Sequence, residues 1–111
     1  MPREMPENLS YLLEQMQCLG PVEARRMFGA YGIFIDGIMF GLYSDEQLYL
    51  KADSVSAEKF EQRGLPPFIY QRSGKEIALS YRCAPEDFID DTEVMSVWGM
   101  EAIFAAHRSR R

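Results

Sequence analysis

The chain has 111 residues, of which 47% are hydrophobic, 13% aromatic and 26% charged. One hydrophobic core commonly occupies roughly 100 to 150 residues, so we expect a single domain over residues 1–111 with its core at about 8–106. The net charge of −5 opposes the phosphate backbone, whose neutralisation supplies most of the affinity of nucleic-acid-binding proteins. Composition therefore disfavours direct nucleic-acid binding.

The sequence predicts no membrane span, and its amino end shows no signal-peptide core. Apolar runs stay shorter than the roughly 18 to 20 residues of a bilayer span, and charged residues interrupt the amino end. Cys18 and Cys83 are far apart and form no zinc-binding spacing, so we expect free packing thiols in a reducing compartment. These features predict a cytoplasmic protein without membrane contact.

A first helix is predicted over about residues 8–19. Apolar residues recur there at helical spacing, namely Leu9, Leu12, Leu13 and Met16. Gly20-Pro21 ends the run. Such a helix presents one apolar stripe to a core.

A tight hairpin is predicted around Asp36-Gly37, a dipeptide typical of a type I′ turn. Loop length fixes the register, which pairs Ile35 with Ile38, Phe34 with Met39, Ile33 with Phe40, Gly32 with Gly41 and Tyr31 with Leu42. One face, expected under helices, then carries Tyr31, Ile33, Ile35, Ile38, Phe40 and Leu42. The reverse face carries Gly32, Phe34, Met39 and Gly41.

The next strand, over residues 47–52, places Leu48 and Leu50 on one side and Tyr49 and Lys51 on the other. If the leucines join the core, the connection through residues 44–46 must have an odd length, because an even loop would turn them to the wrong face.

The remaining chain alternates between helix and sheet. A short helix is predicted at about residues 57–61, a second hairpin at 68–72 and 76–83, and a final helix with Val94, Trp98, Ala102 and Ala105 on one face. The order αβββαββα predicts an α+β, two-layer sandwich with an antiparallel sheet and helices mainly on one face.

The predicted glycine pair suggests an interaction site. Glycine weakens strands and is typically kept where a close backbone approach requires it, so Gly32 and Gly41 would form a shallow notch. Flanked by Phe34, Met39 and Tyr49, this face exposes apolar area unless another surface covers it. We expect a homodimer or protein-partner contact there; sheet twist or cover from the last helix is the alternative.

The chain carries few residues suited to catalysis. Its only histidine, His107, lies in a basic tail, and no catalytic set, cofactor-binding motif or metal-ligand spacing is recognisable. The acidic cluster at 86–93 lacks the ligand spacing of a calcium loop and is better explained as the start of a helix. We expect no catalytic residues, no cofactor and no enzymatic activity.

A second hypothesis concerns three cations. Arg25, Arg26 and Lys51 could converge at one end of the sheet and bind a carboxylate or phosphate. Solvated charges on strand ends are the simpler interpretation. If the cations converge, the chain would be a small anionic-ligand-binding or enzymatic domain.

Several segments, in this order and spacing, resemble the N-terminal domain of the TfoX (Sxy) competence regulators over about residues 9–106: RRMFGAYGIFIDGIMFGLY, LYLKAD, PPFIYQRSGKEIALSYRCAPEDFIDD and VWGMEAI. The resemblance implies a fold similar to secretion chaperones, often dimeric, and a bacterial protein connected with transcriptional control of DNA uptake. It implies no reaction. We expect a stand-alone version that lacks the C-terminal domain of those regulators and acts as a non-catalytic protein-interaction domain.

Overall fold

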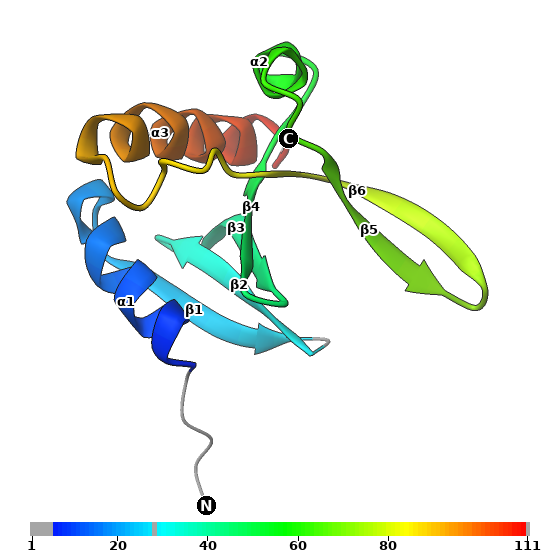
Figure 1. The fold of residues 1–111 in the computed structure, drawn as a ribbon, viewed down its shortest axis with the longest axis horizontal. Helices are drawn as coiled ribbons and strands as arrows, with labels where there is room; N and C mark the ends of the chain where they lie inside the picture. Colours follow the sequence, from blue (N-terminus) through cyan, green and yellow to red (C-terminus); the bar gives the residue numbers. More distant parts are fainter. Residues whose placement is uncertain (1–5, 28, 111) are drawn as a thin grey trace, which may run out of the picture.

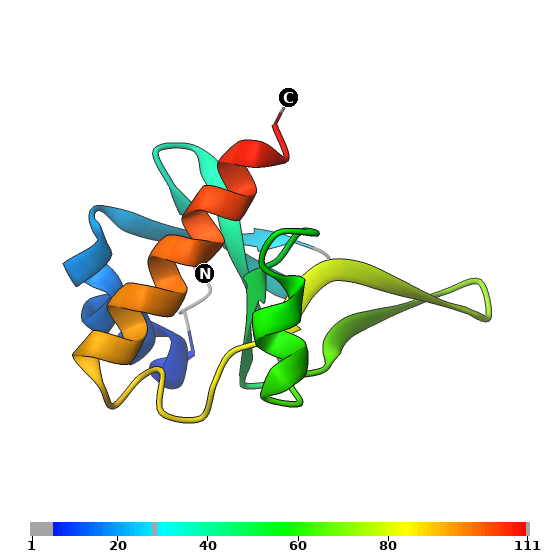
Figure 2. The same cartoon turned by 90° about the horizontal axis from the view of Figure 1, so that it is seen from above.

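The computed structural model of the chain describes residues 6–27 and 29–110. Its centre is a six-stranded antiparallel sheet with the strand order β1-β2-β3-β4-β6-β5, and helices pack on one face of it (Figures 1 and 2). Phe28 and Arg111, which belong to the sequence motif and to the basic tail, lie outside the described residues.

The elements follow one another as α1 (Glu7–Met16), a short 3-10 helix η1 (Gln17–Leu19), β1 (Val22–Met27), β2 (Ala30–Ile35), β3 (Ile38–Ser44), β4 (Gln47–Lys51), α2 (Ala57–Gln62), β5 (Pro67–Arg72), β6 (Lys75–Cys83) and α3 (Thr92–Arg108). The predicted α+β class, with helices mainly on one face, is confirmed, and the predicted elements occur in the predicted order. Strand β1 is additional. It was missed because its sequence, VEARRM, is mostly polar, as suits an edge strand that pairs only with β2.

Helices α1 and α3 cover the same face of the sheet. The predicted apolar stripe of α1 is buried at Leu9, Leu12 and Met16, and the chain leaves η1 at Gly20, whose φ of 132° suits glycine. Helix α3 packs on β3 and β4 through small and large residues, including Trp98 and Ala102. Among the described residues, no helix is long and apolar enough to cross a membrane.

The start of α3 explains part of the acidic cluster. The carboxylate of Asp91 accepts hydrogen bonds from the backbone N–H groups of Glu93 at 2.9 Å and Val94 at 3.2 Å. Because these N–H groups have no partner within the helix, a carboxylate in this position stabilises the helix start by about 1 kcal/mol. The helix-start interpretation is confirmed at Asp91.

The first hairpin confirms its turn and corrects its register. Asp36 and Gly37 have φ values of 50° and 77°, as a type I′ turn requires, and the two predicted pairs nearest the turn are formed. Beyond them a β-bulge inserts Phe40, so the pairs are Ile33 with Gly41, Gly32 with Leu42 and Tyr31 with Tyr43. The three predicted pairs farther from the turn are therefore wrong.

The bulge also explains the next turn. Past Phe40 the faces of β3 exchange, so Tyr43 rather than Leu42 lies on the core side and pairs with Leu48. The connection to β4 is the two-residue turn Asp45-Glu46, an even length, yet Leu48 and Leu50 are buried in the core as predicted. The odd-loop prediction is wrong because the bulge at Phe40 had already exchanged the two faces of β3, so an even loop returns the leucines to the core side.

The second hairpin, β5–β6, projects away from the helices (Figures 1 and 2). Its strands turn at Ser73-Gly74, and Arg72 pairs with Lys75. Residues 71–80 are all exposed, whereas β2 and β3 are mostly buried. This part of the sheet therefore has no helix layer behind it.

Candidate functional site

The face of the sheet opposite the helices is called the open face here. Residues directly opposite one another in an antiparallel pair share a face, so the register assigns its members strand by strand. Leu42 pairs with Gly32 and with Tyr49, and Tyr49 pairs with Cys83. Alternation along each strand then adds Met27, Phe34, Met39, Ile77, Leu79 and Tyr81.

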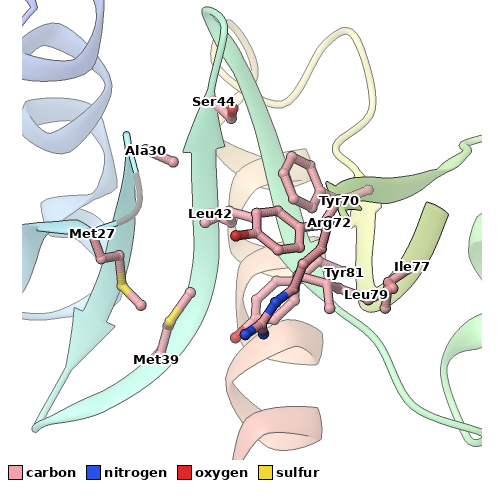
Figure 3. Close-up of a pocket in the computed structure, with 11 residues that line it drawn as sticks. Met27, Ala30, Met39, Leu42, Ser44, Tyr70, Arg72, Ile77, Leu79 and Tyr81 are labelled. Atoms are coloured by element: carbon pink, nitrogen blue, oxygen red, sulfur yellow. The ribbon is translucent and has the colours of Figure 1, made fainter. Parts of the chain in front are cut away.

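A groove of about 450 Å³ lies on the open face where the β5–β6 hairpin bends toward the central strands (Figure 3). One wall comes from β1, β2 and β3, with Met27, Ala30, Met39, Leu42 and Ser44. The other wall comes from the hairpin, with Phe68, Tyr70, Arg72, Ile77, Leu79 and Tyr81. The two walls are far apart in the chain, and the strand order brings them together.

The hairpin wall keeps apolar side chains in contact with solvent. Ile77 is 41% exposed and Leu79 is 38% exposed, although both belong to a regular strand. Contiguous apolar surface of this kind is costly in water and commonly marks an interaction site or a ligand groove. The groove is therefore the leading candidate site.

Two cations contact aromatic side chains of the open face. Arg25 stacks over the Phe34 ring at 4.6 Å and lies 3.9 Å from the Glu23 carboxylate. The Lys51 ammonium lies 5.1 Å from the centre of the Tyr81 ring and donates a 2.6 Å hydrogen bond to the Ser80 hydroxyl.

Three titratable groups on the open face, Tyr49, Tyr81 and Cys83, have a raised pKa. Burial raises the pKa of Tyr81 to about 12, and burial also raises the pKa of the Cys83 thiol. The pKa of Tyr49 is raised, first by burial and then by the charges of Cys83 and Asp45. Nucleophilic catalysis by these groups would require shifts in the opposite direction.

The cysteines and the histidine form no catalytic set among the described residues. Cys18 and Cys83 are free thiols, the first exposed and the second half-buried. His107 is exposed near the end of α3, and its side chain has no hydrogen bond or ion pair within the described residues.

The predicted interaction face is only partly assembled as expected. Gly32, Phe34, Met39 and Tyr49 lie on the open face, but Gly41 lies on the helix-covered face. A Cβ on Gly41 would be 3.1 Å from the Ile33 Cβ in the core. The predicted glycine notch is therefore wrong, and the bulge at Phe40 is the reason.

Gly32 serves a different purpose from the one predicted. A Cβ there would meet the Met27 sulfur and the Phe34 ring, each at 2.8 Å. The Met39 sulfur lies 3.1 Å from the same position. Because Gly32 has no side chain, Met27 of β1, Phe34 of β2 and Met39 of β3 can pack over it. The result is a continuous apolar floor beside the groove.

The three predicted anion-binding cations are not brought together. Arg25 and Arg26 are consecutive in β1 and point to opposite faces of the sheet. Lys51 is in β4, three strand positions away from β1, which at about 4.8 Å per strand is roughly 14 Å. Anion binding by any one of them stays a prediction.

The most important groove residues were not singled out from the sequence. The alternation of Ile77, Leu79 and Tyr81 predicts an apolar side for β6 but does not say what covers it. Only the strand order shows that β5 and β6 form the far edge of the sheet, beyond the helices. Tyr70 and Arg72 line the groove because β5, which carries them, lies at this edge of the sheet.

Fold and face together define a class: a small α+β domain with one sheet face buried under helices and the other open and apolar. The profile of the TfoX N-terminal domain family matches residues 14–106, so the chain belongs to this family. It is 32% identical over 68 residues, 61% of the chain, to Protein Sxy of Escherichia coli (strain K12). It is 30% identical over 84 residues, 75% of the chain, to DNA transformation protein TfoX of Haemophilus influenzae (strain ATCC 51907 / DSM 11121 / KW20 / Rd). These matches cover 32% and 38% of the length of the two relatives.

Proposed function

We propose that the chain is a non-catalytic protein-interaction domain of the cytoplasm that contributes to transcriptional control of DNA uptake in bacteria. The family assignment supports the regulatory setting, since a relative with 30% identity is named a DNA transformation protein. In this proposal the groove docks another protein or a second copy of the chain.

The open apolar groove is the observation that carries the proposal. A fully buried Leu or Ile side chain contributes about 1.5 to 3 kcal/mol relative to an exposed one. Because Ile77 and Leu79 are about two-fifths exposed, covering both would release about 1 kcal/mol each. Covering the neighbouring aromatic side chains Phe68, Tyr70 and Tyr81 would add to this driving force.

The test is complementation in a strain that lacks the gene. Leu79→Glu places a charge in the groove wall, on an exposed strand where it does not disturb the core. Phe104→Glu is the matched control, since Phe104 is 53% exposed on the outer side of α3. Transcripts of DNA-uptake genes report function, and circular dichroism checks that both variants fold.

We expect Leu79→Glu to lose most of the transcript increase and Phe104→Glu to retain it. A fully active Leu79→Glu variant would refute the groove as the functional surface. Loss only in Phe104→Glu would move the interface to the helix side of the domain.

One observation favours a second candidate function, the binding of a small anionic ligand. The groove has a volume of about 450 Å³, within the range of small-molecule sites, and Arg72 is among its lining residues. Native mass spectrometry of protein purified under mild conditions tests this directly. A bound metabolite that is lost in Arg72→Ala but retained in Arg26→Ala would support it, and an unliganded mass in the presence of cell metabolites would oppose it.

A further inference from the structure

We propose that the groove recognises an acidic segment of a partner protein whose apolar side chains act as anchors. This inference rests on the proposed function, because it names the chemistry of the partner that docks on the open face. Its support comes from charge placement, from the position of Arg72 and from the shape of the hairpin.

The charge on the open face is opposite in sign to that of the whole protein. The chain has a net charge of −5. By strand register, however, the open face carries one acidic residue, Glu23, and the cations Arg25, Lys51, Arg72 and Lys75. Glu23 already lies 3.9 Å from Arg25, so the positive charge on the hairpin side is left without compensation on this face. Such a field attracts acidic partners and steers their approach.

Arg72 is placed to bind a carboxylate. Figure 3 shows its side chain extending from β5 into the groove beside Tyr81. Within the described residues, no carboxylate lies within 4.0 Å of its guanidinium group. Arginine offers several donors in one plane and commonly holds a carboxylate through two hydrogen bonds. An acidic side chain at the groove mouth would provide that missing partner.

The groove floor and walls supply the second part of the recognition. Apart from Arg72 and Ser44, the lining side chains are apolar or aromatic, and Met27 and Met39 face each other across the floor. Methionine adapts its shape to different apolar groups. An acidic segment without apolar side chains would leave this surface wet, so the segment must carry Leu, Ile, Phe or similar anchors.

Two other occupants fit less well. A second copy docked face to face would bring the same cations together, and like charges in close contact oppose binding. A nucleic acid requires several phosphate contacts to gain affinity, and this acidic protein offers few cations over walls that are partly aliphatic. The charge pattern therefore selects an acidic peptide segment.

The test is selection of random dodecapeptides, displayed on phage, against the immobilised chain. We expect the selected peptides to be enriched in Asp and Glu and in large apolar residues, relative to the starting library. Affinity of a selected peptide should fall about tenfold in Leu79→Glu and in Arg72→Glu, which corresponds to about 1.4 kcal/mol each. It should stay unchanged in Arg26→Glu, which alters the opposite face of β1.

Three results would overturn the proposal. The first is selection of neutral or basic peptides, or of peptides whose binding does not depend on Leu79 and Arg72. The second is a dimer in sedimentation that dissociates on Leu79→Glu, since the groove would then hold a second copy. The third is tighter binding of a single-stranded oligonucleotide than of the selected peptides, with the same dependence on Arg72.

Failure of the acidic-partner proposal can be distinguished from failure of the proposed docking function. Complementation by Leu79→Glu tests whether the groove is used in the cell at all. Loss of complementation together with selection of non-acidic peptides would retain the docking function and reject the acidic partner.

Discussion

Arg108, in the last turn of α3, donates two hydrogen bonds to the carboxylate of Asp53, at 2.6 Å to Oδ2 and 3.0 Å to Oδ1. Asp53 lies between β4 and α2 and also accepts from the backbone N–H groups of Val55 and Ser56. One carboxylate thus joins the end of the long helix to the start of the short one.

The Asp53→Asn variant should lose about 1 to 2 kcal/mol of unfolding free energy at pH 7. The hydrogen bond from Arg108, aided by Ser56, lowers the pKa of Asp53 from 3.8 to about 2. Asp53 is 19% exposed and Arg108 is 39% exposed, so solvent screens part of the interaction and the lower half of the range is expected. Urea denaturation measures the difference.

The pH dependence has a defined sign. Because the folded pKa is depressed, the contribution of Asp53 is fully present above pH 3.8 and is lost as the pH falls toward 2. The stability difference between wild type and Asp53→Asn should therefore shrink by about half at pH 3. Asp87→Asn is the control: the Asp87 carboxylate lies 3.7 Å from Arg63 and both side chains are about half exposed, so its removal should change stability little at any pH. A constant difference across pH would contradict the role of the Asp53 charge.

The bulge predicts unequal costs for two glycine substitutions. A Cβ on Gly41 would press on the Cβ and Cγ1 atoms of Ile33 at 3.1 and 3.3 Å, and a Cβ atom cannot rotate away. Overpacking of this kind typically costs about 1 to 3 kcal/mol. At Gly32 the nearest atoms are the far ends of Met27, Phe34 and Met39, which can move. Thermal unfolding should show Gly41→Ala as the more destabilising change, and the reverse order would argue against the observed register.

The same bulge buries a hydroxyl group. Tyr43 faces the core, and among the described residues its hydroxyl has no hydrogen-bond partner. Burial, followed by the charge of Glu46, raises its pKa. A buried polar group without a partner costs about 1 to 3 kcal/mol.

Tyr43→Phe should therefore be neutral or stabilising, by up to about 1 kcal/mol. Tyr31→Phe, on the paired position of β2, is the matched control and should change stability less. Chemical denaturation of the three proteins decides the matter. A clear destabilisation by Tyr43→Phe would show that the hydroxyl has a partner after all, such as a bound water.

Sequence patterns were sufficient where the signal was local. The Asp36-Gly37 turn, the apolar stripe of α1 and the burial of Leu48 and Leu50 follow from turn chemistry and periodicity. The bulge at Phe40 has no such signal, because the residues around it are apolar on both faces of the strand. When both faces of a strand are apolar, the alternation of residue types cannot show where the side chains exchange faces.

The groove could not be predicted for a related reason. Its two walls depend on strand order and on the bend of the second hairpin, which are properties of the whole sheet. The sequence did place Phe34, Met39 and Tyr49 on the face away from the helices. It could not show that Arg72 and Leu79 would lie across the groove from Met39.

Tyr81 should titrate unusually late. Burial raises its pKa to about 12, so absorbance of the phenolate should include a component that appears above that of ordinary tyrosines. Tyr81→Phe should remove this component, and Tyr11→Phe, on α1 away from the groove, should retain it. Because the unfolded state ionises near pH 10 and the folded state does not, stability should fall from pH 10 to pH 12, and less steeply in Tyr81→Phe. An unchanged late component in Tyr81→Phe would assign it to another residue.

The β5–β6 hairpin should open more readily than the rest of the sheet. Residues 71–80 are exposed and no helix covers them, whereas Ile33 and Phe40 are fully buried under α1 and α3. Local opening is easier where few apolar contacts are lost, so amide hydrogen exchange at Ile77 and Leu79 should be faster by orders of magnitude than at Ile33. A selected acidic peptide should slow exchange at Ile77 and Leu79 in wild type, and about ten times more peptide should be needed for the same effect in Arg72→Glu. Equal protection of the two hairpins in the free protein would mean that the groove wall is already rigid, and adaptation on binding would then have to come from the methionines of the floor.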